Sequence, residues 1–184
     1  MLFVRKTWAR LTGDFALAVR LDLQQRYFDG FDEPHWSQDM NAAFVLAAHG
    51  DTAAARARAE QAIPVMKAEL EKQPASAGLW AGLSGAYALL GDKAQALRAG
   101  QKAMELVPES ADAVAGPTYS QNLASCLAYL SDKDRALAEL ARLLRTPYGE
   151  NIYVARYSAA WFPLHGDPRF EALVNDLKNN APMP

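Results

Sequence analysis

Apolar side chains recur along this chain with the spacing of amphipathic helices, and short polar stretches interrupt them at regular intervals. Ala and Leu, both strong helix formers, dominate the apolar stretches. No window alternates apolar and polar residues with the period of two that a half-buried strand requires. The pattern predicts an all-α fold, with helices near 2–12, 14–27, 35–49, 51–73, 75–90, 92–107, 117–130 and 132–145, a short helix near 149–157 and a last one near 167–178.

A Gly-Asp or Ser-Asp pair separates successive helical stretches. The pairs begin at Gly13, Gly50, Gly91, Ser131 and Gly166, at intervals of 37, 41, 40 and 35 residues. Glycine adopts the left-handed conformation after a helix C-terminus, and aspartate accepts hydrogen bonds at the next N-terminus. The spacing therefore predicts a series of helical hairpins, each close to the length of one helical repeat.

Residues 77–110 resemble the tetratricopeptide repeat. The family's order of large and small side chains is carried here by Trp80, Leu83, Tyr87, Ala96, Ala103 and Pro108. The large residues fill the space between two helices, and the alanines allow their backbones to approach. Ser84 stands where the family usually has Gly, and Gly100 where it usually has a large aromatic residue. The second departure indicates a looser or locally compensated hairpin.

The resemblance implies one domain over residues 1–184, a short right-handed superhelix of stacked antiparallel hairpins. Its expected parts are a degenerate repeat at 1–28, repeats at about 35–73, 75–108 and 111–146, and C-terminal capping helices at 149–180. The segment from Leu164 to Leu173 is similar to the terminal cap of tetratricopeptide regions in bacterial multidomain signalling proteins. The chain is thus expected to be the sensor or interaction part of a bacterial signalling or regulatory protein.

In such a superhelix the first helix of each hairpin lines the concave face, where a peptide or partner protein binds. The positions that the resemblance places in this groove are Met40, Asn41, Phe44, Gly78, Ala81, Gly82, Gly85, Ala88, Gln121, Asn122, Ser125 and Tyr129. The small residues form either the floor of the groove or a surface for close helix packing. Asn41 and Asn122 can donate and accept hydrogen bonds along a peptide backbone, or they bond locally. These positions hold no Lys or Arg, which disfavours an acidic peptide tail in this groove.

The N-terminal segment is more apolar than the polar cap with which a helical repeat array usually ends. Its apolar residues include Leu2, Val4, Trp8 and Leu11. We expect them to form a homodimer contact, or else to pack against a domain that precedes them.

Composition narrows the range of partners. The chain has 184 residues, 51% of them hydrophobic, and a formal net charge of −2, so it lacks the basic field of a nucleic-acid-binding protein. The single cysteine, Cys126, forms no intrachain disulfide, and no signal peptide or membrane span is evident. These features favour a cytoplasmic protein that binds other proteins, without nucleic acid, membrane or cofactor.

Catalytic chemistry has little basis in the sequence. The residues around Ser84 lack the second glycine and the strand-to-helix turn of a nucleophile elbow. Glu33, His35 and Asp39 lie in an acidic stretch and are weak candidates for holding a metal ion, although such a stretch is more often a solvated loop and helix start. A binding protein is therefore expected, and a small hydrolase with an unorthodox, metal-assisted site in the groove or at 29–39 is the alternative.

Overall fold

The computed structural model describes residues 35–179, and within them the chain is all-helical, with no strand. The α-helices are α3 (His35–Ala48), α4 (Thr52–Lys72), α5 (Ala77–Leu90), α6 (Lys93–Leu106), α7 (Gly116–Tyr129), α8 (Lys133–Leu143), α9 (Ile152–Tyr157) and α10 (Pro168–Asn175). Two short 3-10 helices are η1 (Ala159–Leu164) and η2 (Leu177–Asn179). The predicted all-α class is confirmed. The predicted repeat at 1–28 and the contact residues Leu2, Val4, Trp8 and Leu11 lie outside the described residues.

The Gly-Asp pairs mark helix boundaries as the sequence predicts. Gly91 ends α5 in the left-handed conformation, with φ of 79°, and Asp92 begins α6 by accepting a 3.0 Å hydrogen bond from the amide of Gln95. Gly50 has φ of 90°, and Asp51 caps α4 in the same way. These local signals fix where one helix stops and the next can start.

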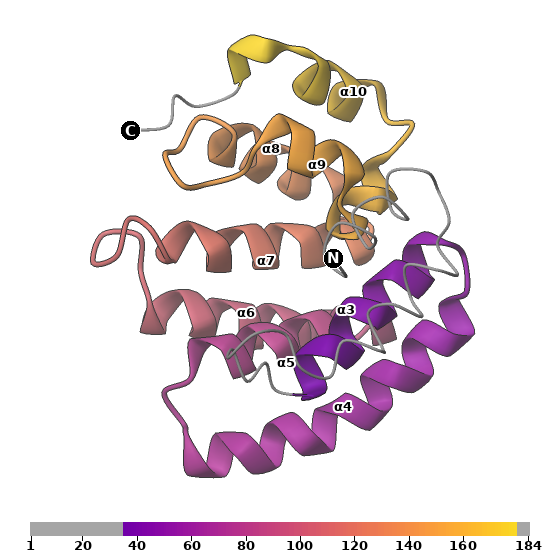
Figure 1. Ribbon diagram of the computed structural model, residues 1–184, viewed down its shortest axis with the longest axis vertical. Coiled ribbons are helices and arrows are strands. Elements are labelled where there is room, and N and C mark those ends of the chain that lie inside the picture. The colour runs from indigo at the N-terminus through magenta and orange to yellow at the C-terminus, as the bar shows by residue number, and fades with distance from the viewer. Residues whose placement is uncertain (1–34, 180–184) are drawn as a thin grey trace, which may run out of the picture.

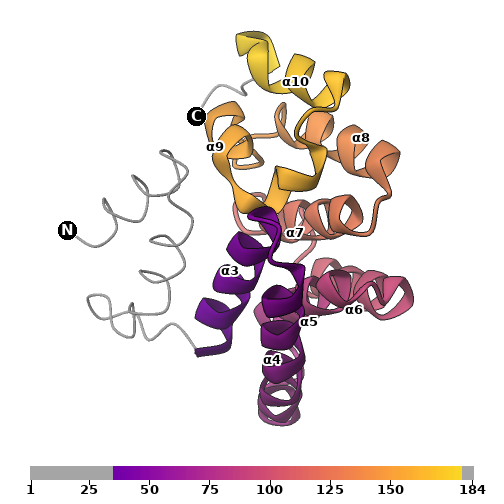
Figure 2. The same ribbon diagram turned by 90° about the vertical axis from the view of Figure 1, so that its right-hand side faces the viewer.

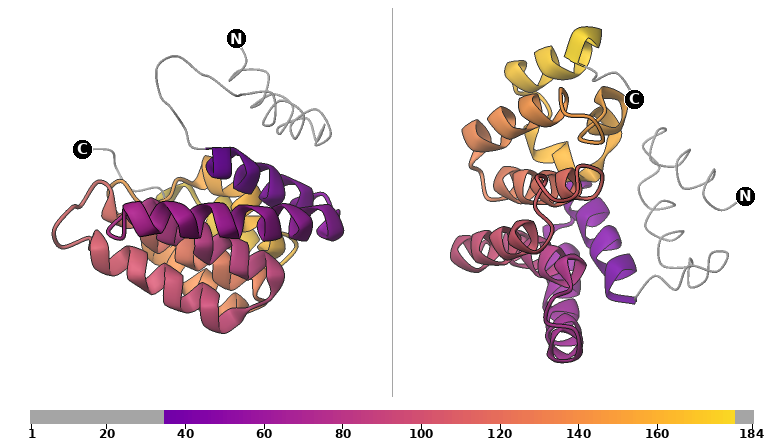
Figure 3. Two further views of the ribbon diagram at one scale, coloured as in Figure 1. Left: turned by 90° about the horizontal axis from the view of Figure 1, so that it is seen from below. Right: turned by 90° about the vertical axis from the view of Figure 1, so that its left-hand side faces the viewer.

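Consecutive helices pack on one another along the long axis of the molecule, from α4 at one end to α10 at the other (Figure 1). The short connections between α3 and α4, α5 and α6, and α7 and α8 join helices that contact each other, so each pair is an antiparallel hairpin. Helix α5 is central, because it packs against α3, α4, α6 and α7 (Figure 3). Residues on α5 are therefore within reach of three hairpins.

Pro64 does not end the helix that contains it. A proline inside a helix favours a kink or a stop, but α4 does not stop there and extends from Thr52 to Lys72. A proline inside a helix costs about 3 kcal/mol. Ala59, Ala62 and Met66, on both sides of Pro64, are buried, so packing of the whole apolar face of α4 outweighs that cost.

The C-terminal segment folds back over the helical stack instead of only extending it. Helix η1, which the sequence pattern did not predict, packs against both α3 and α7 (Figure 2). Trp161 and Leu164 of η1 are fully buried with Phe170 of α10. Among residues 35–179, no helix combines the length and apolar character needed to cross a membrane.

Candidate functional site

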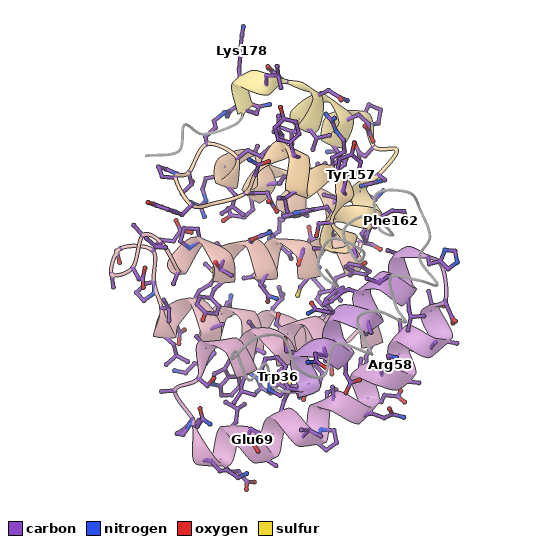
Figure 4. All side chains as sticks on the ribbon, viewed as in Figure 1. Trp36, Arg58, Glu69, Tyr157, Phe162 and Lys178 are labelled. Atoms are coloured by element: carbon purple, nitrogen blue, oxygen red, sulfur yellow. The ribbon has the colours of Figure 1, made fainter. Side chains whose placement is uncertain are left out.

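Residues from α3, α5 and α7 that the sequence analysis assigned to one groove line a common recess of about 170 Å³. The predicted residues around this recess are Met40, Asn41, Phe44, Gly78, Ala81, Gly82, Gly85 and Asn122, and Trp36 and Ser37 complete its wall. Trp36 lies near the start of α3 (Figure 4). Positions far apart in sequence therefore meet on one face of the molecule.

The glycines of α5 allow other helices to approach closely. A Cβ atom on Gly82 would lie 2.6 Å from Cζ3 of Trp36 and 2.7 Å from the sulfur of Met66. A Cβ atom on Gly85 would lie 3.0 Å from the ring of Phe44. At Gly78, by contrast, no atom beyond the neighbouring turns of α5 lies within 4 Å of the position of a Cβ. Gly82 and Gly85 therefore serve mainly for helix packing, whereas the space beside Gly78 is open.

The two candidate amides differ in exposure but both retain hydrogen-bonding capacity. Asn41 is exposed, and its side chain makes no hydrogen bond with another residue in the range 36–179. The Oδ1 atom of Asn122 has only a long contact, 4.0 Å, from the thiol of Cys126. Two carboxamides, one on α3 and one on α7, thus border the recess with donors and acceptors available.

The remaining predicted groove residues on α7 are engaged by the chain itself. The amide of Gln121 donates a 2.5 Å hydrogen bond to Glu150, and the hydroxyl of Tyr129 donates one of 2.7 Å to the carbonyl of Ala159. Ser125 is buried and donates to a carbonyl within α7. The segment after α8 therefore covers this part of the face, a long-range contact that the repeat pattern does not contain.

Glu150 is a buried carboxylate that sequence reasoning missed. Its Oε2 accepts a hydrogen bond from the side chain of Gln121 and one of 2.6 Å from the indole of Trp161. Its Oε1 accepts a hydrogen bond of 2.8 Å from the backbone N–H of Asn151. Burial raises the pKa of Glu150 above its usual 4.5, while these hydrogen bonds act in the opposite direction. The residue lies in an irregular connection, so no periodic signal marks it as buried. Its three neutral donors fasten the returning segment to α7.

Of the metal-site candidates, only Asp39 has its side chain in the described part of the structure. Asp39 pairs with Arg58 of α4 at 3.2 Å, while Glu33 and the side chain of His35 lie outside the described part. No group of three or more His, Cys, Asp or Glu side chains between residues 36 and 179 is placed to hold a metal ion. Ser84 is buried inside α5, where its hydroxyl donates to the carbonyl of Ala96 at 2.9 Å. Nothing in this geometry gives Ser84 the position of a nucleophile.

A second and larger recess lies on the other side of α5. It is a cleft of about 680 Å³ between α4 and α6, and Trp80, Leu83 and Tyr87 form its floor. At 100° per residue these three share one face of α5, opposite the face of Gly82 and Gly85. The three large residues are expected from the sequence in the interior of the hairpin, but Trp80 and Tyr87 are only partly buried.

These two recesses use opposite faces of the central helix. No protein-family model matches the sequence, and neither a curated protein nor a solved structure shows significant similarity to it.

Proposed function

We propose that this chain is a tetratricopeptide-like solenoid that binds a short segment of another protein on the face formed by α3, α5 and α7. The stacked hairpins α3–α4, α5–α6 and α7–α8 support this architecture. The caps at Asp51 and Asp92 keep the expected repeat spacing, 41 residues apart, and Asp132 follows 40 residues later. In this proposal the C-terminal helices, from α9 onward, form the cap of the array.

The observation that carries the proposal is the recess bordered by Asn41 and Asn122. Its volume of about 170 Å³ is below the ~300–1,000 Å³ typical of small-molecule sites, so it suits a single side chain. A carboxamide both donates and accepts, as a peptide backbone does. In the proposed complex, one side chain of the bound segment enters beside Gly78 while the two amides hold its backbone.

The biological setting is part of the same proposal. Pro168 occupies the first turn of α10, and Asp167 accepts a 3.0 Å hydrogen bond from the amide of Arg169. This capped helix agrees with the terminal cap expected from the resemblance to bacterial signalling proteins. We therefore propose that the chain is the interaction part of such a protein.

Homodimer formation through the N-terminal apolar residues is also proposed. Trp8→Glu would place a charge among them and is expected to shift the protein from dimer to monomer. Multi-angle light scattering of the full chain measures this shift. A wild-type protein that is already monomeric at all concentrations would contradict the dimer, without affecting the peptide site.

The peptide site is tested with Asn41→Ala plus Asn122→Ala in the full chain. Partner proteins captured from the source cell by the wild type are quantified by mass spectrometry and compared with those captured by the variant. We expect partners that depend on the recess to be lost. A matched control, Gln61→Ala plus Gln73→Ala, removes two exposed carboxamides from outside the recess and should retain them. Capture that is insensitive to the asparagine changes would refute the proposal.

A further inference from the structure

The α4–α6 cleft, on the face of α5 opposite the proposed peptide recess, carries unpaired positive charge near Tyr87. The Nζ atom of Lys67 lies 5.9 Å from the centroid of the Tyr87 ring. Arg98 lines the wall on α6, where its guanidinium donates to the neutral side chain of Gln95. Both cations are exposed, and neither forms an ion pair within residues 36–179. An acidic group entering beside Tyr87 would therefore meet two cations that pair with no carboxylate within residues 36–179.

The other end of the cleft has the opposite balance. Trp80 marks this end, where its indole donates to the carbonyl of Pro74 at 3.0 Å. Glu71 lines the cleft from α4, and Lys102 and Glu105 form a 3.4 Å ion pair on α6. Because α6 runs antiparallel to α5, Lys102 and Glu105 lie nearer Trp80 than Arg98 does. One positive and two negative groups give this end a net charge of −1, against +2 near Tyr87.

The next position in the helical stack provides an internal comparison. A recess of about 300 Å³ lies between α6 and α8, with α7 as its floor. Ser120 and Leu127 occupy the places that are aromatic in the α4–α6 cleft, 40 residues earlier in the chain. Arg135 in this recess is already paired with Asp132 at 3.5 Å. The aromatic floor and the unpaired cations are therefore particular to the α4–α6 cleft and are not a general result of stacking hairpins.

The length and the lining of the cleft suit an extended polypeptide segment. Its wall on α6 runs from Gln95 to Glu105, and these ten steps along the helix span about 15 Å at 1.5 Å per residue. Its centre is apolar and its rims are charged, which is the arrangement found in protein–protein interfaces. Tryptophan and tyrosine are also the residue types that contribute most often to the binding energy of such interfaces.

We propose that the α4–α6 cleft is a second docking site, which binds an apolar segment of a partner protein with an acidic side chain beside Lys67 and Arg98. The apolar side chains of that segment cover Trp80, Leu83 and Tyr87, and the acidic group pairs with the two cations. The polarity of the cleft fixes the direction of the segment, because the reverse direction places its acidic group near Glu71 and Glu105. This site does not depend on the recess of Asn41 and Asn122.

The test uses random peptides displayed on phage and selected against the immobilised full chain. The counter-target is Lys67→Glu plus Arg98→Glu, which changes only exposed side chains. We expect peptides enriched on the wild type, and depleted on the counter-target, to combine apolar residues with Asp or Glu. One such peptide, synthesised with a fluorophore, should lose affinity for the variant by about tenfold or more in a polarisation assay.

Two control variants distinguish binding in this cleft from general effects of charge and from binding in the recess of Asn41 and Asn122. Lys133→Glu plus Arg135→Glu makes the same change of charge on α8 and should leave the affinity of the peptide within about twofold, since exposed charges are screened at a distance. Asn41→Ala plus Asn122→Ala should also leave it unchanged. The inference is overturned if no peptide is enriched, if the enriched peptides lack acidic residues, or if the α8 variant weakens binding as much as the cleft variant does. Thermal unfolding of each variant verifies that the fold is retained.

Discussion

Leu123 of α7 occupies the space into which a side chain at Gly100 of α6 would project. A Cβ atom on Gly100 would lie 2.6 Å from Cδ1 of Leu123 and 2.9 Å from the hydroxyl of Ser84. The aromatic residue usual at this position of a tetratricopeptide repeat has no room here, since the neighbouring hairpin already fills the space. The hairpin is thus locally compensated, which is one of the two alternatives that the sequence left open.

Gly100→Ala and Gly78→Ala should therefore change stability in opposite directions. Alanine is favoured over glycine in a helix by about 1 kcal/mol. At Gly100 overpacking against Leu123 should exceed this gain and cost a net ~1–2 kcal/mol. At Gly78 no atom lies within 4 Å, so the variant should be as stable as the wild type or up to ~1 kcal/mol more stable. Urea denaturation measures both, and equal effects of the two substitutions would contradict the packing argument.

Glu150 should make stability depend on pH. Burial raises the pKa of its carboxyl above 4.5, so the folded protein binds this proton more tightly than the unfolded chain does. Its stabilising contribution is complete below pH 4.5 and is lost as the pH rises through the higher pKa of the folded state. Glu150→Gln removes this titration, so the stability of the variant relative to wild type should improve between pH 4.5 and neutrality.

Chemical denaturation of both proteins at a series of pH values measures that trend. Glu60→Gln, at an exposed site on α4, is the matched control and should show a smaller change in relative stability with pH. A constant difference between wild type and Glu150→Gln over this range would show that the carboxyl of Glu150 titrates alike in the folded and unfolded chains.

Cys126 should be unreactive in the folded protein. Its thiol is fully buried, and desolvation raises its pKa from 9.0 to about 11. A rise of two units reduces the thiolate fraction at neutral pH by about 100-fold, and burial further blocks access. Reaction with Ellman's reagent should therefore be at least ~100-fold slower in buffer than in denaturant. Rapid labelling of the folded chain would contradict the burial of Cys126.

Tyr129→Phe should loosen η1 without unfolding the helical stack. The variant removes the 2.7 Å hydrogen bond from the hydroxyl to Ala159, which typically contributes ~1 kcal/mol. Hydrogen exchange followed by mass spectrometry should be faster in residues 159–164 of the variant than in the same residues of the wild type. Exchange in α5 should be the same in both proteins. Tyr153→Phe, at an exposed position on α9, is the control and should leave the exchange of η1 unchanged. Equal protection of η1 in wild type and Tyr129→Phe would show that the hydroxyl does not hold this segment.

Sequence signals between neighbouring residues account for most of the secondary structure that could be predicted. The boundary at Gly91 and Asp92 is readable because its determinants, a positive φ and a side-chain cap, involve only neighbouring residues. Pro64 shows the limit of that reasoning, since burial of the apolar face of α4 overrides a local helix breaker. The residues of the recess near Asn41 could be assigned to one face because the family resemblance places them at equivalent positions of successive hairpins. The burial of Glu150 could not be predicted, because an irregular segment has no periodicity from which burial can be inferred.

The sequence by itself determined that residues 35–179 are helical and, to within about two residues, where the helices between residues 51 and 145 begin and end, since those outcomes depend on contacts within a few residues. Only the tertiary structure decided which surfaces stay open. The return of residues 150–164 across α7 closes one part of the predicted face, and the packing of α4 and α6 on α5 opens a cleft on the other. Both result from contacts between residues distant in sequence, whose geometry a pattern of hydrophobic positions does not specify.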